Sequence, residues 1–165
     1  MTVLVRSEHP GAGTAPRRLR AKAQTFLRAL GREEAELSIL LTTDAGIRRL
    51  NRRWRSIDRP TDVLSFPLSD PPGAGTLLGD VVISLDTAVR RGGEDARTVR
   101  AELDRYLAHG ILHLLGFDHE RRSDAKVMAA REEALVRAEG LVGAAMKHGR
   151  IGRSGKGPRR RKKKE

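Results

Sequence analysis

The segment His109-Gly-Ile-Leu-His-Leu-Leu-Gly-Phe-Asp-His119 restricts the fold of this 165-residue chain more than any other part of the sequence. His109 and His113 are four residues apart, so on a helix their imidazoles project from the same face. Gly116 then allows the helix to end and the chain to turn back, which would bring His119 beside them. Three neutral imidazoles with an open fourth position form the ligand set of a catalytic zinc. The sequence therefore predicts a helix, a tight turn and one open metal site.

The spacing of these histidines matches the long zincin motif, in which a glutamate directly after the first histidine is the general base. Position 110 is glycine in this chain, so that base is missing. Another group could supply the base, or a metal hydroxide could act alone at its lowered pKa. If the substrate is RNA, its own 2′-hydroxyl could be the nucleophile. Asp118, next to His119, could either hydrogen-bond a ligand imidazole or cap the turn.

Hydrophobic periodicity predicts an α+β fold with the element order β-α-β-α-β-β-α-α. We expect a single mixed sheet of about four strands covered by helices, one of which is the zincin-like histidine helix. Ile47, Leu50 and Trp54 are expected on the inner face of the second helix. The expected strands are 2–6, 36–42, 63–66 and 77–85, and the expected helices are 17–30, 44–55, 96–115 and 123–139.

The positive charge of the chain is concentrated at its C-terminus. The net charge is +12, and residues 147–165 account for +9 of it. A basic run rich in glycine cannot bury apolar surface, so we expect a catalytic domain over residues 1–146 and a disordered tail over 147–165. The tail is expected either to contact nucleic acid through phosphate charge or merely to aid solubility. Without cysteines, a signal segment or a membrane-length apolar run, the chain is expected to be cytoplasmic and to have no membrane partner.

Beyond these features, the chain resembles the YbeY family of bacterial rRNA maturation factors, which are metal-dependent, single-strand-specific endoribonucleases. The likeness rests on three blocks, which are the histidine segment, Leu50–Arg55 followed by Pro60–Pro67, and Leu78–Ser84. It implies that His109, His113 and His119 hold one zinc ion per chain.

The same resemblance makes Arg55 the functionally required arginine of the family. Its planar guanidinium suits a phosphate, although a solvated surface arginine is the commoner case. Arg52, Arg53 and Arg59 would widen a basic, RNA-binding surface around it.

The function implied by the resemblance is cleavage of single-stranded rRNA at the 3′ end of the small-subunit (16S) rRNA and in ribosome quality control. The partners would be single-stranded rRNA and the small ribosomal subunit. Two alternatives stay open. The spacing of the histidines supports a zincin-type metallopeptidase, but Gly110 opposes it. The sparse aromatic residues and the basic tail would also fit a non-catalytic ribosome assembly factor with structural zinc.

Overall fold

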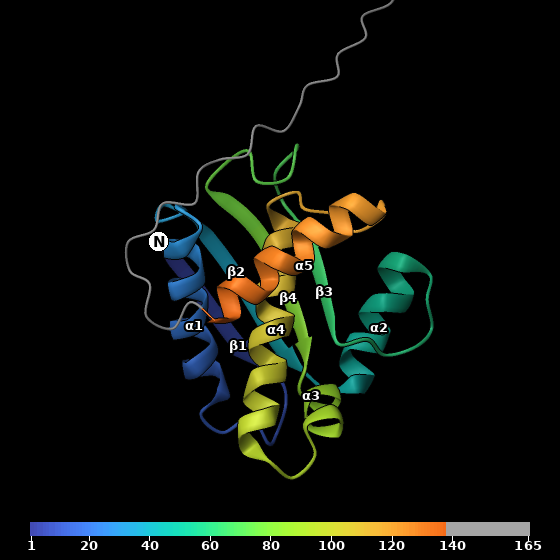
Figure 1. Cartoon of the computed structure of the whole chain (residues 1–165). Coiled ribbons are helices and arrows are strands. Elements are labelled where there is room, and N and C mark those ends of the chain that lie inside the picture. Colours follow the sequence, from blue (N-terminus) through green and yellow to red (C-terminus); the bar gives the residue numbers. More distant parts are fainter. Residues whose placement is uncertain (138–165) are drawn as a thin grey trace, which may run out of the picture.

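Residues 1–137, which the computed structural model describes, form one four-stranded sheet and five helices (Figure 1). This arrangement confirms the predicted α+β class and the predicted order of strands and helices, to which one short helix is added. The strands are β1 (Thr2–Ser7), β2 (Glu36–Thr42), β3 (Val63–Pro67) and β4 (Leu77–Ser84). The helices are α1 (Ala15–Ala29), α2 (Asp44–Arg55), α3 (Leu85–Gly92), α4 (Ala96–Leu114) and α5 (Arg122–Arg137).

The sheet is mixed, with the strand order β1-β2-β4-β3. β1 pairs parallel to β2, and β2 pairs parallel to β4. β3 is antiparallel to β4 and occupies the edge of the sheet. Parallel neighbours need a crossover connection, which α1 provides between β1 and β2.

Helices cover the two faces of the sheet unequally. α1 and α4 lie on one face, with α5 across α4, while α2 lies on the other side beside β3 (Figure 1). The larger core includes Ile39, Ile83 and Ile111, all fully buried. The smaller core joins Ile47 of α2 to Leu64 and Val82, which are paired across β3 and β4. Side chains alternate along a strand, so neighbouring residues of β3 and β4 serve opposite cores.

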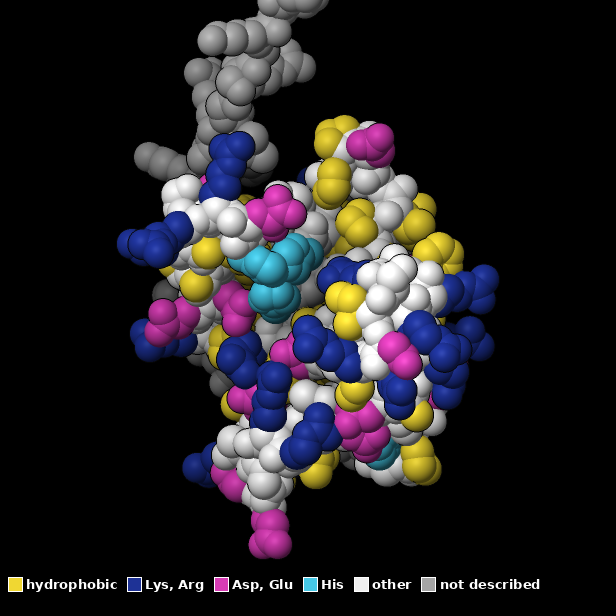
Figure 2. Space-filling model, turned by 90° about the vertical axis from the view of Figure 1, so that its right-hand side faces the viewer, with side chains coloured by type: hydrophobic (Ala, Val, Ile, Leu, Met, Phe, Trp, Pro, Cys, Tyr) yellow, Lys and Arg dark blue, Asp and Glu magenta, His cyan; other side chains and the backbone are white. Residues whose placement is uncertain are grey.

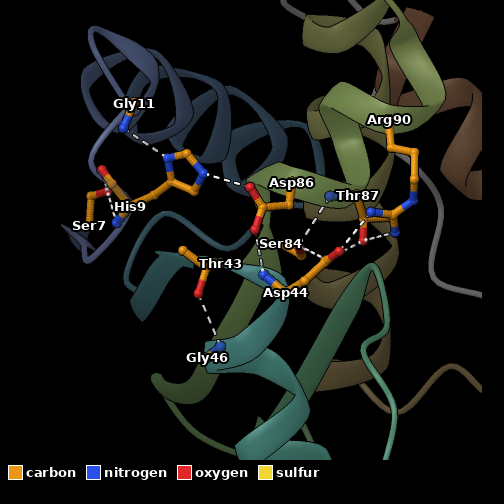
Figure 3. Close-up of polar contacts among 10 residues, drawn as sticks. All are labelled: Ser7, His9, Gly11, Thr43, Asp44, Gly46, Ser84, Asp86, Thr87 and Arg90. Carbon is orange, nitrogen blue, oxygen red and sulfur yellow. Dashed lines mark hydrogen bonds and ion pairs between the residues drawn. The ribbon is translucent and has the colours of Figure 1, made fainter.

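The short helix α3 was not expected from the sequence. It begins because Ser84, the last residue of β4, caps it by accepting a hydrogen bond from the Thr87 backbone amide at 3.2 Å. Asp44, at the start of α2, accepts hydrogen bonds from Ser84 and Thr87 and pairs with Arg90 at 2.6 Å (Figure 3). This polar network fixes α3, and therefore its arginines, against the start of α2.

The predicted inward position of Trp54 is wrong. Its side chain is 63% exposed, although Ile47 on the same helix is fully buried. Trp54 meets the ring of Phe66 edge-on, with ring centroids 6.3 Å apart, at the border of a groove of about 770 Å³ on the sheet face opposite α4. α2 buries its stripe against β3 and β4 only near Ile47, so the end of the stripe reaches past the smaller core.

Within residues 1–137, no helix is both long and apolar enough to cross a membrane. The predicted basic tail, 147–165, lies outside the described residues, so the division into a domain over 1–146 and a tail stays a prediction.

Candidate metal centre

The end of α4 has the geometry that the glycine at position 116 predicted. The backbone amide of Phe117 donates to the Leu112 carbonyl, and the amide of Gly116 donates to the His113 carbonyl, both at close to 3 Å. These two bonds form a Schellman motif, which requires a left-handed residue where Gly116 has a φ of +87°. The motif ends the helix and reverses the chain, so that the segment after it returns toward α4.

This reversal brings the three predicted histidines together. Ligand-capable nitrogens of His109, His113 and His119 all lie within 4.8 Å of one another. The Nε2 atoms of His109 and His113 are 3.1 Å apart. Two nitrogens at about 2.0–2.1 Å from a tetrahedral zinc ion would be about 3.3 Å apart, so the spacing fits a metal ion. His119 is exposed, and the cluster faces solvent (Figure 2).

The environment of His113 favours the neutral form that a metal ligand needs. The pKa of His113 is lowered to about 4, mainly by burial and also by the neighbouring imidazoles of His109 and His119. At neutral pH its ring therefore keeps a lone pair for a cation and carries no opposing charge.

A carboxylate that the sequence did not single out contacts the first of the three histidines. Glu132 of α5 lies 2.9 Å from Nδ1 of His109, and both side chains are partly buried. Because the ionised carboxylate can only accept, Nδ1 carries the proton and Nε2 is left to face the other ligands. A signal was present in the sequence, since Glu132 lies between the buried residues Met128 and Leu135 at helical spacing.

Replacing Glu132 by glutamine is expected to weaken metal binding by about tenfold or more, because the partner of a metal-bound imidazole sets its orientation and basicity. Competition with a chromogenic chelator measures this change. Glu133→Gln is the matched control, since Glu133 is 61% exposed on the same helix and pairs with Arg137. An equal loss of affinity in both variants would contradict the assigned role of Glu132.

Of the two roles considered for Asp118, its contacts match the cap of the turn. Its Oδ1 accepts hydrogen bonds from the backbone amides of His119 and Glu120, at 2.6 and 3.2 Å. The carboxylate thus orders the backbone that carries the third histidine.

Gly110 faces the sheet, where there is no room for a side chain. A Cβ atom there would lie 2.7 Å from a methyl group of Val81 and 3.3 Å from a methyl group of Val63. Its carbonyl accepts a hydrogen bond from the Ser65 hydroxyl at 3.2 Å, which ties α4 to β3. A glutamate at this position would meet β4, so the glycine is explained by close packing of the helix on the sheet.

The arginines predicted to bind RNA are separated by the fold. Arg55 and Arg59 line one cavity of about 370 Å³ together with Arg90 and Arg91 of α3. Arg53 instead lies over the ring of Trp54, 5.4 Å from its centroid, and Arg52 is exposed. Neither of these two lines the cavity. The α3 arginines were missed because the helix that presents them was not predicted.

Known proteins resemble this chain along most of its length. A sequence profile described as "Endoribonuclease YbeY" matches residues 11–140. A protein of Anaeromyxobacter dehalogenans with the same description is 69% identical over 156 residues, covering 94% of this chain and 81% of that protein. One from Myxococcus xanthus is 51% identical over 144 residues, covering 85% of this chain and 49% of the relative.

A solved structure is similar to the fold. The solution structure of TM1509 from Thermotoga maritima matches with a TM-score of 0.58 and 28% sequence identity. The alignment covers 82% of this chain and 87% of that protein.

Proposed function

The chain belongs to the YbeY endoribonuclease family, and we propose that it is a zinc-dependent endoribonuclease that cleaves single-stranded RNA during maturation of the 3′ end of small-subunit rRNA and in ribosome quality control. Its partners in this proposal are single-stranded rRNA and the small ribosomal subunit. The observation that carries the proposal is the cluster of His109, His113 and His119, whose ligand atoms lie within 4.8 Å of one another. The nitrogen-only ligand set favours zinc among the common metals.

The three histidines would hold the ion, and Glu132 would hold His109 in its ligating tautomer. When bound, zinc supplies Lewis-acid chemistry toward a phosphoryl oxygen and a nucleophile from water at neutral pH. Arg55 would bind a phosphate through its guanidinium fork and balance the charge that develops there. Hydrolysis forms one bond between phosphorus and the water oxygen, breaks one ester bond, and gives the leaving ribose oxygen a proton.

The site argues against the two alternatives. A zincin peptidase needs a carboxylate after the first histidine, and the packing of Gly110 against Val81 leaves no space for one. A structural zinc site is closed by four protein ligands. Among residues 1–137, the cluster contains three, and His119 is exposed to solvent.

The substrate class is tested with zinc-loaded protein on three substrates, which are a single-stranded oligoribonucleotide, the same sequence as a duplex, and casein. We expect cleavage of the single strand alone, as the resemblance to single-strand-specific endoribonucleases implies. Chelation should stop the reaction and added zinc should restore it. Metal-dependent cleavage of casein, in a preparation free of other proteases, would contradict the proposal.

An oligonucleotide with one 2′-deoxyribose at the cleaved position distinguishes the two nucleophiles that the sequence left open. Cleavage that persists at this position assigns the attack to water, and cleavage that stops assigns it to the 2′-hydroxyl.

A further inference from the structure

Four arginines line the cavity of about 370 Å³ between α2, β3 and α3, which we call the arginine pocket. Arg55 and Arg59 come from the end of α2 and the loop after it, and Arg90 and Arg91 come from α3. Among residues 1–137, Asp62 is the one carboxylate in the lining, so the pocket carries a net positive charge. No aromatic residue from the described part of the chain lines it, and base stacking therefore has no platform there.

Two of the guanidinium groups are available to a ligand. Among residues 1–137, neither Arg55 nor Arg59 has a side-chain hydrogen bond or ion pair, and both are exposed. The other two are held in place at the wall. Arg90 is fixed by Asp44 and Thr87 (Figure 3), and Nη1 of Arg91 contacts Asp62 at 2.8 Å. The remaining nitrogens of Arg91 are left as donors.

The arginine pocket lies beside the metal centre. Arg91 also donates to the hydroxyl of Tyr106 at 3.3 Å, and Tyr106 precedes His109 on α4 by about one helical turn. On the other side, Leu64 lines the pocket, and the next residue, Ser65, bonds the backbone of α4 at Gly110. Figure 2 shows the histidines with lysine and arginine side chains gathered below them on the same face.

We propose that Arg59, Arg90 and Arg91 of the arginine pocket bind a second phosphate of the RNA strand. This phosphate is a neighbour of the one that is cleaved, for which Arg55 is the proposed partner. This inference rests on the proposed function. Guanidinium groups match phosphate oxygens in a planar, two-bonded geometry, and such contacts set the register of a strand without regard to its sequence. The substrate is accordingly an RNA strand with at least two phosphodiesters, of which one is bound in the arginine pocket and another is cleaved at the metal centre.

The alternative is that Arg90 and Arg91 only stabilise the fold. Their ion pairs are half-exposed, with 59% and 50% of the arginine side chains accessible, and such pairs contribute little to stability. A substitution for which the phosphate-binding role and the structural role predict opposite changes in RNA affinity therefore distinguishes the two roles better than the loss of one ion pair.

The first variant is Arg91→Gln, with Arg105→Gln as its matched control. Both guanidinium groups lie over the Tyr106 ring, 5.8 and 5.7 Å from its centroid, but only Arg91 lines the pocket. Binding of an uncut 2′-O-methyl oligouridylate to the zinc-loaded protein is followed by fluorescence anisotropy. For Arg91→Gln we expect a Kd about tenfold higher. The slope of log Kd against log salt should fall by about 0.7, the value for one phosphate contact.

For Arg105→Gln, the Kd should stay within about twofold of the wild-type value, because the charge that is lost lies outside the pocket and is screened by salt. Equal changes in the two variants would overturn the proposal, because they would report only net charge.

The second variant is Asp62→Asn. The asparagine side chain keeps an oxygen that can accept the hydrogen bond from the Val63 backbone amide, which is 2.8 Å long with Asp62. It no longer places a negative charge beside Arg91 to compete with a phosphate. If the pocket binds phosphate, the oligouridylate should bind more tightly. Weaker or unchanged binding would mean that the Arg91–Asp62 pair is structural and would overturn the proposal.

Cleavage assays separate this inference from the proposed function. A dinucleotide has a single phosphodiester, so Arg91→Gln should raise KM for a longer strand by a clearly larger factor than for the dinucleotide. An equal loss on both substrates would overturn the second-phosphate assignment. The second-phosphate assignment would also be overturned if Arg91→Gln weakened the binding of inorganic phosphate without changing the Kd for the oligouridylate. Cleavage that needs neither zinc nor His113 would overturn the proposed function, whereas Arg91-dependent binding would still support the pocket.

Discussion

Replacing His113 by alanine is expected to remove the bound metal and to lower kcat/KM on single-stranded RNA by about 10³-fold or more. His113 is the central ligand, with its ring centroid 4.7 Å from that of His109 and 5.0 Å from that of His119. Two histidines alone do not complete the three-ligand set of a catalytic zinc. Lewis-acid stabilisation is worth several kcal/mol in a transition state, and each 1.36 kcal/mol is a factor of ten in rate. Elemental analysis and initial rates on the same preparation measure both losses.

His9→Ala is the control for this experiment. His9 lies outside the metal cluster, where it contacts Asp86 at 2.8 Å and accepts from the Gly11 amide (Figure 3). We expect that variant to keep its zinc and its cleavage rate. Circular dichroism checks that His113→Ala is folded. A folded His113→Ala protein that cleaves RNA at the wild-type rate without zinc would refute the metal mechanism.

Replacing Arg55 by alanine is expected to lower kcat/KM on single-stranded RNA by about 10²-fold, the usual cost of losing one donor to a developing anion. The thermal unfolding midpoint should stay the same, because the Arg55 side chain is exposed and forms no ion pair within residues 1–137. Arg55→Lys should recover only part of the rate, since an ammonium group keeps the charge but not the planar fork.

Arg49→Ala provides the comparison for Arg55→Ala. Arg49 is exposed on the same helix and carries the same charge, but it does not line the arginine pocket. A similar loss of rate in the two variants would show that Arg55 contributes general positive charge rather than a specific phosphate contact.

Most of the fold could be predicted from the sequence because its elements have strong, local signals. The stripes of α1 and α4 and the apolar runs of β2 and β4 each specify their own structure. α3 could not be found in this way, since Leu85 continues the apolar run of β4. The change from strand to helix depends on Ser84 turning its hydroxyl to the Thr87 amide. Trp54 was misplaced because periodicity identifies a stripe without showing how far the sheet beneath it extends.

The candidate site, like the fold, could be predicted from the sequence only in part. The three histidines lie within eleven residues, so a helix and one glycine turn determine their assembly. Glu132 reaches His109 only after α5 has packed on α4. Its helical spacing from Met128 and Leu135 indicates that it lies on the packed face, but not which residue it contacts. The same holds for the arginine pocket, in which residues of α2 and α3 meet across the end of β3.

Because Gly110 packs directly against Val81, α4 cannot rotate or slide along β4 without a steric clash. The two histidines on α4 are therefore positioned by apolar packing. We expect this domain to fold without a metal ion, unlike a zinc finger, which is unfolded without its metal. His119 lies outside this packing contact, in the segment after Gly116. If the three histidines bind zinc as proposed, we expect the affinity for the ion to depend on this short segment more than on the stability of the whole domain.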